Sequence, residues 1–292
     1  MRFFKKKQPH NIFVKDLDSL SFNSTNNFQK LNNANPTQTY IITFGDGSNE
    51  LRSALNRFEH QASETGWFKK VQVFNFNKLK KLDIEWYSKH IDFIASNHRG
   101  AGYWIWKPFI ISRYLKLIPK NHFLVYADLG YEINKRGTKR FENYLEISNE
   151  KNLMAWEIKD QTIGKWTKGD ALNYFNFSSN DEITNHLQYE FGLQVIKNTR
   201  ESQNFYDELT IETTDLNYTL VNDESSIAKN PMEFIEHRHD QSIACLSAKK
   251  KNFGYFLPHE SYFPQYWKKG IHPSGMPFAT FRNKTETQKL SY

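Results

Sequence analysis

Apolar and polar residues along the chain predict strands and helices in alternation. The apolar run Thr39–Phe44 ends at the turn Gly45-Asp46-Gly47, which is typical of a buried strand followed by a tight turn. From Asn49 to about Thr65 the apolar positions recur at helical spacing. The same patterns predict further strands at 71–76, 122–128, 153–158 and 193–198, and further helices at 84–96, 108–118, 201–212 and 241–250. Strands that alternate with helices favour an α/β fold with a mostly parallel central sheet and helices on both faces.

The two ends of the chain lack this pattern. Residues 1–38 begin with a basic and aromatic tip, Phe3, Phe4 and Lys5–Lys7, and then become rich in serine and asparagine, which is typical of a poorly ordered lead-in. The C-terminal segment, from about residue 258, is rich in proline and shows little periodicity, so we expect it to be irregular. Between them no repeat or linker interrupts the pattern. We therefore expect a flexible lead-in over 1–38 and one domain over 39–292.

Composition limits the classes of protein to which the chain belongs. Aromatic residues make up 16% of its 292 residues, more than intrinsically disordered chains contain. No apolar run approaches the ~18 residues of a membrane-spanning helix, and the charged N-terminus lacks the apolar stretch of a secretory signal. The single cysteine, Cys245, cannot form an intrachain disulfide. We therefore expect a soluble, globular, cytoplasmic protein.

The net charge of +7 leaves several partners open. Lysines cluster at Lys5–Lys7, Lys78–Lys81, Lys249–Lys251 and Lys268–Lys269, so the positive charge is spread along the chain. Such lysines often form an ordinary solvated surface, but they also suit anionic substrates or an anionic membrane. A nucleic-acid groove would concentrate them more.

Asp128 ends the predicted strand His122–Asp128 and is followed by Gly130 and Glu132. In open α/β sheets ligands bind at the carboxyl ends of the strands, and Mg²⁺ or Mn²⁺ takes carboxylate and phosphate oxygens as ligands. Asp128 is therefore a candidate ligand for a metal or substrate. The pattern supports about equally an aspartate that only caps the turn after the strand.

A second candidate segment, Asn97–Pro108, places Arg99 and Lys107 around two glycines and three aromatic residues. Glycine lets a backbone approach a ligand closely, and arginine makes bidentate contacts with phosphate. The alternative is a glycine-rich turn that leads into a buried aromatic helix.

A third candidate segment, Glu236-His-Arg-His-Asp240-Gln-Ser242, precedes an apolar helical stretch. Clustered ionisable residues perturb one another's pKa values and suit acid–base chemistry or phosphate binding. Helix capping is the alternative for Asp240. The spacing fits no standard zinc pattern. His259 and His272 lie apart, in the proline-rich tail, where a lone histidine is more often a surface residue.

Three segments in this order resemble bacterial glycosyltransferases of the GT-A type, which build capsule, lipopolysaccharide and other surface glycans. They are Arg99-Gly-Ala-Gly-Tyr-Trp-Ile-Trp-Lys-Pro, Leu124-Val-Tyr-Ala-Asp-Leu-Gly and His237-Arg-His-Asp-Gln-Ser. The resemblance covers about residues 39–260 and includes Trp166-Thr-Lys-Gly-Asp170. GT-A enzymes often carry Asp-x-Asp, whereas this chain has Asp128-Leu-Gly130, so the second carboxylate of that metal motif is missing. Any remaining metal ligands then fall to Glu132, a tail histidine or the donor phosphates.

The resemblance implies a single GT-A-like domain that transfers a sugar from a nucleotide-diphosphate donor, with UDP-sugar as the donor we expect. The acceptor it implies is a glycan or a lipid-linked glycan, and the implied cofactor is a divalent metal, Mn²⁺ or Mg²⁺. The implied site residues are Thr43, Phe44, Gly45, Arg99, Lys107 and Asp128 for the donor; Asp240 with His239 as its alternative for catalysis; Trp166, Lys168 and Asp170 for the acceptor; and Asp128 with His259 for the metal.

Two other classes stay open from the sequence. One is a basic nucleic-acid-binding protein that uses aromatic stacking, and the other is a non-catalytic scaffold of a glycan-assembly complex. The glycosyltransferase interpretation predicts no nucleic-acid partner. It also predicts peripheral contact with the inner face of the cell membrane through the basic and aromatic tip of residues 1–38.

Overall fold

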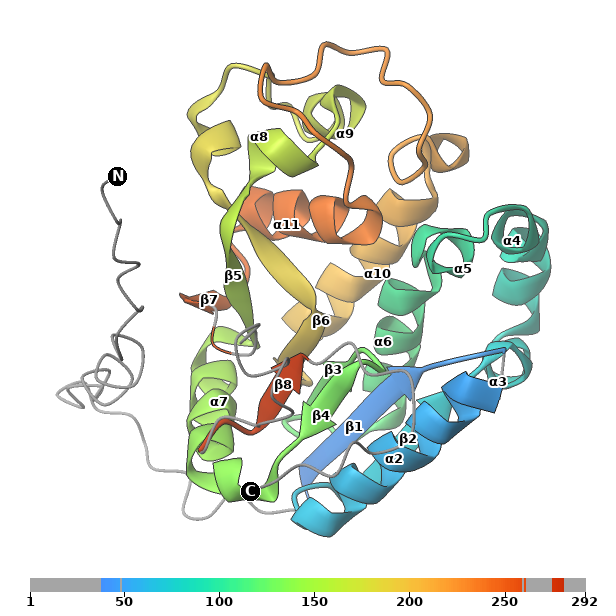
Figure 1. Cartoon of the computed structure of the whole chain (residues 1–292), viewed down its shortest axis with the longest axis vertical. Helices are drawn as coiled ribbons and strands as arrows, with labels where there is room; N and C mark the ends of the chain where they lie inside the picture. The colour runs from blue at the N-terminus through green and yellow to red at the C-terminus, as the bar shows by residue number, and fades with distance from the viewer. Residues whose placement is uncertain (1–37, 48, 259, 261–274, 281–292) are drawn as a thin grey trace, which may run out of the picture. The chain divides into compact units, whose positions relative to one another are not determined.

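Strands and helices alternate along the computed structural model of the chain, which describes residues 38–47, 49–258, 260 and 275–280 (Figure 1). Its strands are β1 Thr39–Phe44, β2 Lys70–Phe74, β3 Phe123–Ala127, β4 Tyr131–Ile133, β5 Leu153–Thr162, β6 Leu187–Lys197, β7 Tyr255–Pro258 and β8 Phe278–Thr280. Its longer helices are α2 Asn49–Thr65, α3 Phe76–Leu82, α4 Ile84–Ser96, α6 Trp106–Leu117, α7 Thr138–Lys151, α10 Arg200–Thr214 and α11 His239–Lys251. Shorter turns of helix are α5 Gly100–Tyr103, η2 Lys135–Gly137, α8 Ile163–Trp166, α9 Gly169–Tyr174, η3 Glu182–Asn185 and η4 Leu216–Tyr218.

Within these residues, six strands form one sheet in the order β2-β1-β3-β6-β5-β7. β1 pairs in parallel with β2 and β3, and β5 pairs in parallel with β7. β6 runs antiparallel to both of its neighbours, with Val125 opposite Val195. The mostly parallel sheet expected from the sequence is therefore confirmed, with β6 as the one reversed strand of the described sheet.

Helices cover both faces of this sheet (Figure 1). Tyr40, Ile42 and Phe44 of β1 belong to the core cluster that also holds the buried residues of α6, α10 and α11. Because side chains alternate along a strand, Ile41 and Thr43 point to the opposite face. There α7 packs against β5 and β6, and α2 against β2. The α/β class with two covered faces is confirmed. Among the described helices, none is both long and apolar enough to cross a membrane.

A small second ladder, β4 with β8, lies beside the turn that follows Asp128. Arg57 of α2 holds this turn by donating to the carbonyl oxygens of Leu129, at 2.7 Å, and Tyr131, at 2.8 Å. Its guanidinium also lies 3.3 Å from the carboxylate of Glu132, and both side chains are almost fully buried. Burial of two charges is tolerated because they compensate each other. The clamp fixes the backbone at the carboxyl end of β3.

Several expectations for the elements were incomplete. The sequence predicted neither the helices α3 and α7 nor the strands β4, β7 and β8, and β6 begins six residues before the predicted strand. β8 lies inside the tail that was expected to be irregular. β8 depends on pairing with β4, about 145 residues earlier in sequence, which no local pattern reports. The rest of that tail and residues 1–37 lie outside the described residues, so the expectation of a flexible lead-in stays a prediction. The described residues group into one compact unit.

We predict that Arg57→Ala lowers the free energy of unfolding by about 3–5 kcal/mol, because it leaves the buried Glu132 carboxylate uncompensated. Urea unfolding followed by circular dichroism measures the change. Arg52→Ala, on an exposed position of the same helix, is the matched control and should change stability by less than about 0.5 kcal/mol. Equal stability of the two variants would contradict the clamp.

Candidate active site

Three charged residues from distant parts of the sequence meet at the carboxyl end of β3. The Lys107 ammonium, in the first turn of α6, lies 3.1 Å from Asp240 Oδ2 and 3.4 Å from Asp128 Oδ1. Asp128 directly follows β3, and Asp240 is the second residue of α11. We call these three residues the Lys107 cluster. The N-cap of α11 is Arg238, so Asp240 lies in the first turn of this helix and is not its N-cap residue.

The three side chains differ in their access to solvent. The side chains of Lys107 and Asp240 are 7% and 8% exposed, whereas that of Asp128 is 40% exposed. Asp128 is therefore the carboxylate of the cluster that an incoming ligand meets first. Beside Lys107 and Asp240 lies a cavity of about 10 Å³, which is no larger than one water molecule. A sugar does not fit in this cavity, so we expect substrate to approach the cluster from the side of Asp128.

Two residues near Asp128 fix its carboxylate. The Tyr126 hydroxyl donates to Asp128 Oδ1 at 2.5 Å. Tyr126 comes two residues before Asp128, so both side chains point to the same face of the sheet. On the neighbouring strand β6, a Cβ added to Gly192 would lie 2.8 Å from Asp128 Oδ2. Glycine at 192 therefore leaves the space that this oxygen occupies. Sequence reasoning missed both residues, although the strand period alone would have pointed to Tyr126.

Burial and charge set the protonation of the cluster. Burial raises the pKa of Asp240 to about 6; the Lys107 ammonium opposes this rise and the Asp128 carboxylate adds to it. Burial on its own would lower the pKa of Lys107, but the two carboxylates outweigh it, so that pKa lies above its ordinary value. Lys107 thus stays charged at neutral pH, and Asp240 is able to exchange a proton near neutrality.

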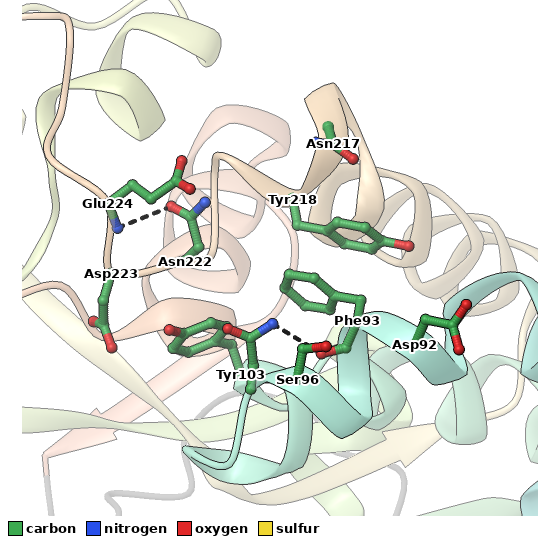
Figure 2. A pocket seen from close by; sticks show the side chains of 10 residues that line it. Asp92, Phe93, Ser96, Tyr103, Asn217, Tyr218, Asn222, Asp223 and Glu224 are labelled. Carbon is green, nitrogen blue, oxygen red and sulfur yellow. Dashed lines mark hydrogen bonds between the residues drawn. The ribbon is translucent and has the colours of Figure 1, made fainter.

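A larger pocket, of about 550 Å³, lies between α4, α5 and the loop after α10 (Figure 2). Its lining consists of carboxylates, amides and aromatic rings: Asp92, Phe93, Ser96, Asn97, Tyr103, Asn217, Tyr218, Asn222, Asp223 and Glu224. The rings of Phe93 and Tyr218 stack with centroids 3.7 Å apart. His239 links this pocket to the Lys107 cluster. It precedes Asp240 in the chain, its Nε2 lies 3.7 Å from Asp223, and its ring centroid is 4.7 Å from that of Tyr103.

Two walls of the pocket have left-handed backbone. Every residue from Gly100 to Trp104 has a φ between 49° and 84°, and every residue from Leu216 to Tyr218 has a φ between 46° and 64°. Left-handed backbone is unfavourable for residues with a Cβ, which explains the two glycines of the first segment. A Cβ at Gly102 would also lie 2.8 Å from a side-chain carbon of Ile94. Gly100 and Gly102 are therefore required by the turn itself. This agrees with the interpretation of the segment as a glycine-rich turn that leads into a buried aromatic helix.

Buried polar side chains hold the loop that carries Asp223. The His237 and His239 rings contact the carbonyl oxygens of Leu220, at 2.8 Å, and Val221, at 2.7 Å. Lys168 Nζ donates to the Asn222 carbonyl at 3.0 Å and to its side chain at 2.8 Å. Burial lowers the pKa of both histidines, so both rings are neutral at neutral pH. A carbonyl only accepts, so each ring donates a proton to its carbonyl.

The other residues named for the acceptor also support this region. Asp170 accepts from the backbone N–H groups of Ile227, at 3.0 Å, and Ala228, at 2.7 Å. The ring of Trp166 lies under the Arg238 guanidinium, 4.1 Å from the carbon to the ring centroid. Lys168 and Asp170 were named for the acceptor from the sequence, and the structure shows them holding this loop. Asp223 was not named from the sequence; it lies in a polar loop without a periodic pattern.

The residues expected to bind the donor occupy three different environments. Lys107 and Asp128 meet in the Lys107 cluster. Arg99 pairs with Glu236 through a short ion pair and lies 3.5 Å from Asp223, so carboxylates already neutralise it. Thr43 and Phe44 are buried, with Phe44 stacked on Trp106 at 3.9 Å.

Gly45, expected beside the nucleotide, packs closely below the turn after β3. A Cβ at Gly45 would lie 2.8 Å from a methyl carbon of Leu129. Its backbone N–H donates to the Phe74 carbonyl at 3.0 Å, which continues the ladder between β1 and β2. The residues of this turn that reach solvent are Asp46 and Gly47.

The Lys107 cluster does not fit a divalent ion held by the protein alone. An ammonium already lies against Asp128, and in the described part of the chain no three His, Cys, Asp or Glu side chains group as metal ligands. Glu132, one of the alternatives for a second carboxylate, is instead paired with Arg57. His259, the other candidate ligand, lies outside the described residues.

We predict that Lys107→Met raises the pKa of Asp240 above about 6, because the ammonium that lowers it is removed while burial and Asp128 remain. Carboxyl-carbon NMR titration of labelled aspartate measures this value. Lys116→Met on the same helix, where the lysine pairs with Asp207, is the control and should leave it unchanged. An unchanged titration of Asp240 in K107M would show that the two groups are not coupled.

We also predict that Asp170→Ala makes the segment 226–236 more sensitive to trypsin, because two backbone N–H groups lose their acceptor. Limited proteolysis with mass spectrometry would locate the cuts, with Asp160→Ala, on an exposed position, as the control. If cleavage did not change but sugar binding was lost, Asp170 would act on the acceptor directly.

Comparisons with known proteins find solved structures of similar fold, two of which are given below. No protein-family model and no curated protein sequence matches the chain. One structure is a glycosyltransferase involved in the glycosylation of the major capsid of PBCV-1, at 9% identity and a TM-score of 0.35, over 68% of this chain and 80% of that one. The other is mouse xyloside xylosyltransferase 1 in its apo form, at 10% identity and a TM-score of 0.39, over 86% of this chain and 99% of that one. At these scores neither similarity assigns an activity to this chain.

Proposed function

We propose that this protein is a glycosyltransferase that uses a nucleotide-diphosphate sugar as its donor. The observation that carries the proposal is the Lys107 cluster, a buried ammonium between two carboxylates at the carboxyl end of a parallel strand. Ligands of open α/β sheets bind at this edge. The ordered segments around Arg99, Asp128 and Asp240 that resemble GT-A glycosyltransferases support the same activity. They contribute all three members of the cluster.

The members of the cluster take different roles in the proposed reaction. Asp128, the exposed carboxylate, contacts the donor. Lys107 keeps Asp128 and Asp240 in place and supplies a fixed positive charge beside the position of the departing diphosphate. Asp240, with its pKa of about 6, is the candidate proton acceptor, or the negative charge that stabilises the sugar as its bond to the diphosphate breaks.

The finer parts of the proposal come from the resemblance. They are a UDP-sugar as the donor, a glycan or lipid-linked glycan of surface polysaccharide as the acceptor, and peripheral contact with the inner membrane face. A divalent ion is the expected cofactor of GT-A enzymes. The described residues do not fit such an ion by themselves, and none of the roles given above depends on one.

The first test is donor binding. Thermal shift and calorimetry with UDP, GDP and CMP, each with Mn²⁺ and with EDTA, should show that a nucleoside diphosphate stabilises the protein. Excess ligand at about 100 times its Kd adds about 2.7 kcal/mol. A scaffold would respond to no nucleotide in either condition. A nucleic-acid-binding protein would instead bind oligonucleotides with strong salt dependence.

We predict that Asp240→Asn lowers turnover of the bound donor about 10²- to 10⁴-fold, the usual contribution of a positioned acid or base. In the wild type kcat/KM should rise as the pH passes about 6, because Asp240 then loses its proton. D240N should lose this rise, and release of nucleoside diphosphate measures both effects. The control is Asp207→Asn, which alters an aspartate of α10 that pairs with Lys116 and is not part of the Lys107 cluster. Near-normal turnover in D240N would refute the role of Asp240.

A further inference from the structure

The pocket of about 550 Å³ next to the Lys107 cluster has an unusual charge for a protein with a net charge of +7. Its lining includes three carboxylates, Asp92, Asp223 and Glu224, and the described lining contains no lysine or arginine. The nearest guanidinium, Arg99, lies 3.5 Å from Asp223 and is also paired with Glu236. A phosphate or uronate would therefore meet net negative charge in this pocket.

The remaining lining suits a polar ring with many hydroxyl groups. Amides of Asn97, Asn217 and Asn222 offer both donors and acceptors, and aromatic rings of Tyr103 and Tyr218 offer flat apolar surface. In Figure 2 the carboxylate of Asp223 and the ring of Tyr103 lie at one end of the pocket and Asp92 lies at the other, with the stacked rings of Phe93 and Tyr218 between them. This mixture is the chemistry that recognises a carbohydrate by its hydroxyl groups and by its apolar ring face.

His239 lies next to Asp223, at this end of the pocket. Its side chain is 2% exposed, and its Nδ1 donates to the Val221 carbonyl at 2.7 Å. In a neutral ring the other nitrogen, Nε2, is then an acceptor, and it has no hydrogen-bond partner among the described residues. Nε2 lies 3.7 Å from Asp223 Oδ1, which is also an acceptor. Nε2 is covered from solvent, whereas the Asp223 side chain is 42% exposed and lines the pocket, so Asp223 is the acceptor of this pair that a hydroxyl or an ammonium group can reach.

We propose that this pocket binds a sugar residue of the acceptor glycan that is uncharged or carries an amine, with a hydroxyl or amine donating to Asp223. This inference rests on the proposed function, because an acceptor exists only if the protein transfers a sugar. It assigns the acceptor to the pocket lined by α4, α5 and the loop after α10. The residues named for the acceptor from the sequence, Lys168 and Asp170, position that loop instead.

The test measures sugar binding directly, in the absence of transfer. Saturation-transfer NMR is recorded with three disaccharide probes that differ in charge: N,N′-diacetylchitobiose, its doubly deacetylated amine form, and a uronate-containing disaccharide. The wild type should bind the first two, and the uronate at least about tenfold more weakly. Asp223→Asn should weaken the amine probe about tenfold or more, because a hydrogen bond to a charged group becomes a neutral one.

Two further variants, at exposed positions, show whether weaker binding comes from the lost charge and not from a folding defect. Asp92→Asn alters an exposed side chain on α4 that also lines the pocket, and it should weaken the amine probe without affecting the fold. Glu150→Gln, on an exposed position of α7 outside this lining, removes the same charge and should leave all probes unchanged. Equal binding of the uronate, or amine binding that is the same in D223N, D92N and E150Q, would overturn the proposal.

Nucleotide binding, measured on the same samples, separates this inference from the proposed function. If UDP binds and no disaccharide does, the pocket assignment fails while the donor proposal stands. If UDP displaces the disaccharides and binds more tightly to D223N, the pocket belongs to the donor and the inference is wrong. If neither UDP nor any disaccharide binds, the proposed function is refuted, and the inference that rests on it is refuted as well.

Discussion

The buried ammonium of Lys107 is the constraint on which the candidate active site depends. A charge that is 7% exposed is stable only if opposite charges compensate it, and here one carboxylate comes from the end of β3 and the other from the start of α11. The ion pairs therefore join three elements that are far apart in sequence. The same requirement explains why Asp128 is orientated by Tyr126 and accommodated by Gly192, since a displaced carboxylate would leave the ammonium partly unpaired.

The segment from His237 to Asp240 has a double role in this arrangement. Its two histidines hold the carbonyls of Leu220 and Val221, and so place the loop with Asp223 over the pocket. Its aspartate completes the Lys107 cluster. Because His239 and Asp240 are adjacent, the larger pocket and the cluster cannot move independently near this point. A single short segment thereby sets the distance between the proposed acceptor site and the proposed donor site.

The left-handed segments beside the pocket come at a free-energy cost of about 1–2 kcal/mol for each residue that carries a Cβ. Ala101, Tyr103, Trp104 and Leu216 to Tyr218 are in this conformation, and His239 is as well, with a φ of 50°. Strain of this kind persists only where surrounding contacts impose it, and it gathers at functional sites. Here the contacts are the buried packing of Trp106 on Phe44 and the polar bonds to the loop of Leu220–Asn222.

The sequence by itself determined several helices and strands, and it identified a strand end that bears a candidate functional residue. The bounds expected for β1, α2 and α4 agree with the structure, because each has an uninterrupted pattern of one period and a clear turn or cap at its end. Asp128 was recognisable because it directly follows an apolar strand. Tertiary structure alone decided that Asp128 lies with Asp240, that β6 runs antiparallel, and that Asp223 faces His239. These are contacts between residues at least 16 positions apart. Local periodicity reports which face of an element is buried, but not which other element will cover it.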